Sequence, residues 1–207
     1  MNDTAKRPAD HEGDDTADDR AARTGAGTAG PAGTGDDEPG TPPGPTVDTL
    51  FGEIAVRLED QDRLTVEGDG IPTVVLERDP ESESDPLIAI GTRDPAALTM
   101  TVDGTDAVIT PAKGKFRRQT YRIDVVHDGA HYRLEPDSVP SSRLTRDGVH
   151  LGDFSSDGDE TVIAEWREDA EVRPADASVG YALASAFGTG GQPLWMMLVD
   201  AVTSALP

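Results

Sequence analysis

The sequence predicts a mostly β fold of the α+β class. We expect an antiparallel β-barrel or rolled sheet, with a short N-terminal helix and hydrophobic C-terminal helices packed on or inside it. Three observations predict it. Apolar and polar residues alternate from Leu64 to Trp166, Asp-Gly pairs separate several of the alternating runs, and the chain beyond Pro174 loses both the alternation and most of its charge.

The first 45 residues carry no large apolar side chain after Met1, and ten acidic residues there outnumber four basic ones. Such a composition buries too little apolar surface to offset the entropy of ordering the chain. We therefore expect a disordered acidic tail over residues 1–45, which ends in a linker from Pro39 to Pro45. Residues 46–207 are predicted to form a single β-rich globular domain.

Residues 46–58 fit two patterns. Ile54, Val56 and Leu58 alternate as they would in a strand. A helix beginning at Thr46 as its N-cap would instead gather five apolar side chains on one stripe. These are Val47, Leu50, Phe51, Ile54 and Leu58. We favour a short helix.

From Leu64 onward the hydrophobic period is two, which is typical of antiparallel strands with one solvated face. The clearest case is Tyr121, Ile123 and Val125, which alternate with polar neighbours. Other alternating sets are Val74 with Leu76, Leu98 with Met100 and Val102, Tyr132 with Leu134, Val149 with Leu151, and Val162 with Ala164 and Trp166.

Asp-Gly pairs mark the turns of this predicted meander, because both residues tolerate the positive φ of a type I′ hairpin turn. Several of the pairs separate two alternating runs. They are Asp69-Gly70, Asp103-Gly104, Asp128-Gly129, Asp147-Gly148 and Asp157-Gly158.

Two weakly charged segments within residues 176–206 are predicted to be helical. Asp176 or Ser178 can cap the first, and Gly188 ends it. Pro193 suits the first position of the second segment. Because both are apolar on most sides, we expect them to be buried against, or inside, the sheet.

Composition excludes several classes of site. The chain has no cysteine, so disulfides, thiolate zinc sites and cysteine nucleophiles are absent. A formal net charge of −22 opposes binding to double-stranded nucleic acid. The N-terminus is polar and acidic, and the apolar run from Pro193 to Leu206 is shorter than the roughly 20 residues of a membrane span. We therefore expect a cytoplasmic protein without a transmembrane segment.

The order of these patterns resembles the tubby C-terminal-like superfamily, which includes LURP-one-related proteins and phospholipid scramblases. The resemblance rests on residues 132–134, 143–152, 162–166 and 176–187. It implies a closed β-barrel around a hydrophobic C-terminal helix, and a binding or scaffolding module that in some members contacts lipid headgroups. The second helical segment after Gly190 departs from the pattern and leaves open which helix is central.

The most unusual local feature is a cluster of basic residues without an acid between Asp106 and Asp124. Phe116 and Tyr121 are interleaved with its charges. Such a loop suits a phosphate, a lipid headgroup or an acidic partner. The alternative is that it only offsets the protein's own acidic surface, as most surface charges do. The cluster consists of Lys113, Lys115, Arg117, Arg118 and Arg122.

Other candidate groups carry weaker signals. His127, His131 and His150 lie beside predicted turns, but no spacing forces them together, so neither a metal nor another cofactor is expected. Trp195 and Met197 suit either an interface or a plain core helix.

Three functional hypotheses follow. The first is a non-catalytic binding or scaffolding module that contacts an anionic ligand or acidic partner through the basic loop. The second is an enzyme whose site combines His127, His150 and strand-end acids. The third is a structural protein that forms oligomers, such as a homodimer, through its last helix. The sequence does not name a ligand or a pathway.

Overall fold

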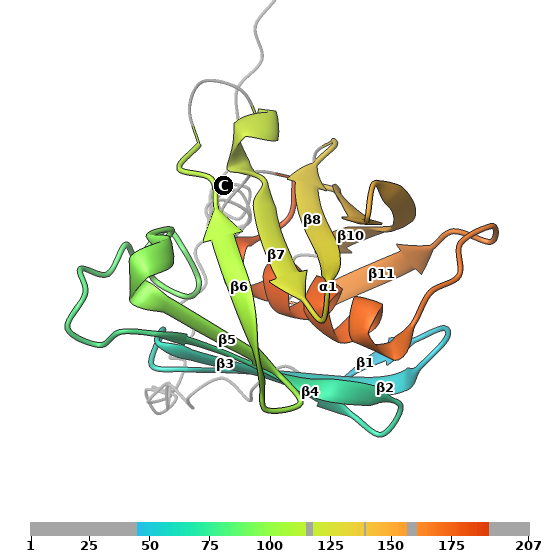
Figure 1. Cartoon of the computed structure of the whole chain (residues 1–207), viewed down its shortest axis with the longest axis horizontal. Coiled ribbons are helices and arrows are strands. Elements are labelled where there is room, and N and C mark those ends of the chain that lie inside the picture. The colour runs from blue at the N-terminus through green and yellow to red at the C-terminus, as the bar shows by residue number, and fades with distance from the viewer. Residues whose placement is uncertain (1–44, 115–117, 139, 157–160, 191–207) are drawn as a thin grey trace, which may run out of the picture. The chain divides into compact units, whose positions relative to one another are not determined.

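The computed structural model describes residues 45–114, 118–138, 140–156 and 161–190. Within them, eleven antiparallel strands follow one another in a single sheet, and each pairs with its neighbours in sequence. The sheet curls into a nearly closed barrel (Figure 1). The strands are β1 (Thr46–Asp48), β2 (Gly52–Glu59), β3 (Arg63–Gly68), β4 (Ile71–Arg78), β5 (Leu98–Val102), β6 (Thr105–Pro111), β7 (Ile123–His127), β8 (Ala130–Pro136), β9 (Ser142–Arg146), β10 (Val149–Ser156) and β11 (Val162–Trp166).

The predicted β class and the antiparallel meander are confirmed in this part of the chain. Three Asp-Gly pairs form two-residue turns in which both residues have positive φ, as the type I′ geometry requires. These are Asp103-Gly104, Asp128-Gly129 and Asp147-Gly148. Asp69-Gly70 also joins two strands, β3 and β4, but without positive φ at either residue. Asp157-Gly158 lies outside the described residues.

The predicted helix over residues 46–58 is wrong: this segment forms the hairpin of β1 and β2. The Asp48 carboxylate accepts hydrogen bonds from the backbone N–H groups of Leu50 (2.8 Å) and Phe51 (3.1 Å), which reverses the chain. Ile54 is fully buried, whereas Leu50 is 56% exposed. The helical stripe would have buried both residues, so the alternating strand pattern was the better guide.

The hydrophobic helix α1 (Pro174–Phe187) lies inside the curled sheet, and every residue from Asp176 to Phe187 is buried. Its burial confirms the expectation drawn from its lack of a polar face. The helix begins earlier than predicted. Pro174 occupies its first turn, and the Asp176 carboxylate accepts the backbone N–H of Arg173 at 2.8 Å instead of starting the helix. Gly188 ends it as predicted. The second predicted segment lies outside the described residues.

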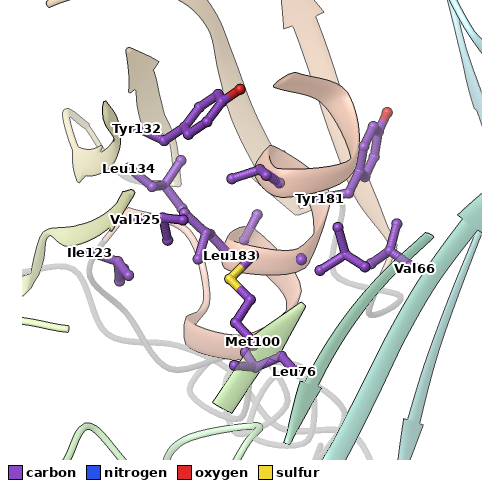
Figure 2. Close-up of a cluster of buried hydrophobic side chains, with 14 of the residues drawn as sticks. Val66, Leu76, Met100, Ile123, Val125, Tyr132, Leu134, Tyr181 and Leu183 are labelled. Carbon is purple, nitrogen blue, oxygen red and sulfur yellow. The ribbon is translucent and has the colours of Figure 1, made fainter. Parts of the chain in front are cut away.

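Figure 2 shows how the inner faces of the strands meet this helix. Side chains from β3, β4, β5, β7 and β8 point inward toward Leu183 and Tyr181 of α1. The labelled strand residues are Val66, Leu76, Met100, Ile123, Val125, Tyr132 and Leu134. The helix therefore supplies the centre of the core.

Gly180 allows α1 to approach β10 closely. A Cβ atom at this position would lie 2.8 Å from Cε2 of Phe154 and 3.0 Å from a methyl group of Leu144. Glycine is thus required here for space. Among the described residues, no helix is long and apolar enough to cross a membrane.

Candidate functional site

Two buried carboxylates in the barrel interior are the first places to look for chemistry. The Asp48 side chain is 4% exposed and accepts hydrogen bonds from Nε1 of Trp166 and the hydroxyl of Tyr181, both at 2.9 Å. With the two backbone donors of the β1–β2 turn, it has four hydrogen-bond donors. Burial and the Asp48 charge raise the pKa of Tyr181 far above its usual value. This carboxylate joins β1, β11 and α1.

The second interior carboxylate, Asp176, is paired in a similar way. It forms an ion pair with Arg146 of β9, which also donates to the carbonyl oxygen of Glu171 at 3.1 Å. Burial, together with the charge and hydrogen bond of Asp176, raises the pKa of Tyr132 to about 12. Both carboxylates therefore hold the helix in the barrel. Oδ2 of Asp176 accepts from Arg146 and Arg173, whereas its Oδ1 is buried without a hydrogen-bond partner among the described residues.

The basic cluster lies on the connection between β6 and β7, which extends beyond the ends of both strands (Figure 1). Lys113 is exposed and makes no ion pair with another described residue. Arg118 begins the 3₁₀ helix η2 (Arg118–Tyr121). Arg122 ends the connection just before β7. Lys115 and Arg117 lie outside the described residues.

Backbone hydrogen bonds hold the two arms of this connection together. The N–H of Ala112 donates to the carbonyl of Arg122 at 2.9 Å, and the N–H of Gly114 donates to the carbonyl of Thr120 at 3.1 Å. The hairpin thus continues past β6 and β7 as a narrow ladder. We call residues 112–114 and 120–122 the loop base.

Arg93 supports the loop base from outside the cluster. Its Nη1 donates to the carbonyl oxygens of Ala112 (2.9 Å) and Tyr121 (3.1 Å). Its guanidinium carbon lies 5.3 Å from the ring centroids of both Tyr121 and Phe187. Burial lowers the pKa of Arg93 to about 10, against an opposing effect of Tyr121, so the side chain stays charged at neutral pH. Arg93 was not identified from the sequence as a residue that supports the basic loop.

No family model, curated protein or solved structure matches this chain.

Arg122 forms an ion pair within the protein but remains partly exposed. Its Nε lies 3.1 Å from Oδ2 of Asp124, whose other oxygen accepts from Nε of Arg133 at 2.7 Å and lies 3.2 Å from Nε2 of His131. One carboxylate therefore serves two guanidinium groups and a histidine. The local charge remains positive, and the side chain of Arg122 is still 44% exposed.

The histidines do not converge on a recognisable site. Nε2 of His150 lies 3.2 Å from Oδ1 of Asp153, and Nδ1 of His127 is buried without a hydrogen-bond partner in the described structure. Across the described ranges, no group of three or more potential metal ligands occurs. The other predicted contact residues, Trp195 and Met197, fall in the part of the chain that is not described.

Proposed function

We propose that this chain is a non-catalytic binding module whose basic loop contacts a phosphate or carboxylate group on its ligand. The loop comprises Lys113, Lys115, Arg117, Arg118 and Arg122. The observation that carries the proposal is the hydrogen-bonded extension of the β6–β7 hairpin, whose base contains Lys113 and Arg122, in a chain of net charge −22. A positive group in an otherwise negative field attracts anions over about a Debye length, roughly 8 Å at physiological salt.

The polar groups of the barrel interior argue for binding and against catalysis. Asp48 has four hydrogen-bond donors, and Asp176 pairs with Arg146. Carboxylates engaged in this way serve packing and closure. A general acid or base instead needs access to the proton of a substrate.

We also propose a distant relationship to the tubby C-terminal-like superfamily, with α1 as the central helix. The support is the sequence pattern, together with a buried hydrophobic helix inside an antiparallel meander. This relationship is in keeping with a binding or scaffolding role.

The test is neutralisation of the loop in the full chain. Lys115→Gln, Arg117→Gln and Arg118→Gln are combined in one variant. Binding is measured to inorganic pyrophosphate, to fluorescein-labelled hexaaspartate, and to phosphatidylcholine vesicles with and without phosphatidylserine. We expect at least one probe to bind the native chain and to lose on the order of tenfold or more in affinity, as the removal of charge-assisted hydrogen bonds predicts.

The matched control removes three arginines elsewhere: Arg57→Gln, Arg63→Gln and Arg167→Gln. Each is exposed and paired with an acid on its own strand ladder or loop. If both triple variants weaken binding equally, only net charge matters and the proposed site is wrong. Unchanged binding in the loop variant, or no binding of any probe to the native chain, also contradicts it. The probe that binds identifies the source of the anionic group.

A further inference from the structure

We propose that Arg93 is the positioning residue of the basic loop: it fixes the loop base and thereby holds in place Lys113 and Arg122, the two cations that the base contains. This inference rests on the proposed function for its consequence in binding. Its structural part, the ordering of the loop base, stands independently and has its own measurement.

The hydrogen bonds of Arg93 join the two arms of the loop base. Ala112 lies on the arm that leaves β6, and Tyr121 lies on the arm that leads into β7. The same nitrogen, Nη1, donates to a carbonyl oxygen of each arm. Two ladder hydrogen bonds also connect these arms, from Ala112 to Arg122 and from Gly114 to Thr120. A single donor shared by both arms therefore fixes their separation.

The rings on either side of Arg93 tie the loop base to the barrel core. Tyr121 belongs to the loop, whereas Phe187 is the last residue of α1 and is 7% exposed. A planar guanidinium can stack on two rings and still donate in its own plane, which an ammonium group cannot do. The loop base thus rests, through Arg93, on the end of the central helix.

The segment that carries Arg93 is itself held in place. The N–H of Ile90 donates to the carbonyl of Ala186 in α1 at 3.2 Å. On the other side, the Thr92 hydroxyl accepts the N–H of Asp94 at 3.1 Å, and Asp94 caps the 3₁₀ helix η1 (Pro95–Ala97). Arg93 is therefore presented from a fixed backbone, as a residue that positions others must be.

The first experiment replaces Arg93 by lysine in the full chain, which keeps the net charge and every loop cation. We expect amide hydrogen exchange at Ala112 and Gly114 to accelerate about tenfold or more, because the ladder loses the donor that holds its arms together. Affinity for the probe that binds the native chain should fall on the order of tenfold. Arg63→Lys, an exposed arginine on β3, is the control and should change neither quantity.

The second experiment separates positioning from a general structural role. Arg93→Ala should lose affinity in the same way, and added ethylguanidinium should restore both amide protection and affinity. Added ethylammonium should restore neither. The midpoint of urea unfolding of Arg93→Lys should stay near that of the native chain, since the core contacts of α1 are retained.

The outcomes distinguish this inference from the proposed function. Unchanged amide exchange in Arg93→Lys, or faster exchange without a loss of affinity for a bound probe, overturns the positioning role. If Arg93→Lys accelerates amide exchange at Ala112 and Gly114 while no probe binds the native chain, the proposed function fails and the structural role of Arg93 stands. Equal rescue by ethylammonium overturns the requirement for a guanidinium.

Discussion

The hydroxyl of Tyr181, in the middle of α1, donates a 2.9 Å hydrogen bond to the carboxylate of Asp48, which lies 133 residues earlier at the end of β1. The same carboxylate oxygen accepts Nε1 of Trp166 from β11. Side chains thus connect the first and last strands through the helix, where a further ladder would otherwise close the barrel.

Replacing Asp48 by alanine should destabilise the domain by about 3 kcal/mol, because the buried hydroxyl of Tyr181 and the partly buried indole N–H of Trp166 would lose their acceptor. Asp48→Asn keeps one acceptor oxygen and should cost less. Urea unfolding followed by tryptophan fluorescence measures both. Asp106→Ala, at an exposed position of β6, should stay within about 0.5 kcal/mol of the native chain. Equal effects of Asp48→Ala and Asp106→Ala would show that the hydrogen bonds of Asp48 do not hold β1 and β11 together.

Alkaline pH should destabilise the domain through its buried tyrosines. The folded-state pKa of Tyr132 is about 12, above the value of about 10 in an unfolded chain. The folded state therefore retains a proton that the unfolded state loses. Stability from this group is complete below about pH 10 and is lost between about pH 10 and 12, by about 1.4 kcal/mol per pH unit.

Urea titrations across this pH range measure that slope, and phenolate absorbance follows the ionisation directly. Tyr132→Phe should remove the contribution of one tyrosine from the slope, while the part due to Tyr181 remains. An unchanged slope in Tyr132→Phe would show that Tyr132 ionises alike in the folded and unfolded chains.

Gly180→Ala should destabilise the domain by about 1–3 kcal/mol, although alanine is the better helix former by about 1 kcal/mol. The added methyl group would meet the ring of Phe154 and a methyl of Leu144. Phe154→Leu makes room, so the double variant should lose less stability than the sum of the two single changes. Chemical denaturation of all four proteins gives the coupling energy. Additive losses would mean that the two side chains do not compete for one space.

Arg146→Met should cost about 3–5 kcal/mol, because it leaves the buried carboxylate of Asp176 without its counter-ion. Adding Asp176→Asn should recover part of that loss. Arg63→Met with Glu77→Gln gives the corresponding cycle for an exposed pair, which should be coupled by less than about 1 kcal/mol. The same coupling in both cycles would contradict the difference in burial.

Local signals predicted the strands and turns well. Alternation at Tyr132 and Leu134, and positive φ at Asp103-Gly104, depend on residues adjacent in sequence. The hairpin of β1 and β2 was mispredicted because a helical stripe fitted the same segment as the alternation of Ile54, Val56 and Leu58. The side chains that hold Asp48 in the fold, those of Trp166 and Tyr181, lie 118 and 133 positions away in the sequence. Short-range periodicity does not contain this information.

The candidate site was also predicted only in part. A run of cations without acids is visible in any reading of residues 107–123, whereas Arg93 looks like an ordinary surface arginine between Thr92 and Asp94. Its partners at Ala112, Tyr121 and Phe187 come together only in the folded chain. Prediction from sequence therefore identified the charges but missed their support.

The late position of α1 in the chain affects synthesis on the ribosome. Each strand pairs with a strand made just before it, so the meander can assemble stepwise as the nascent chain emerges. The helix on which those strands pack is translated after all of them. Until residue 187 has left the exit tunnel, the inner face of the sheet has no central partner, and the growing chain exposes apolar surface that chaperones recognise.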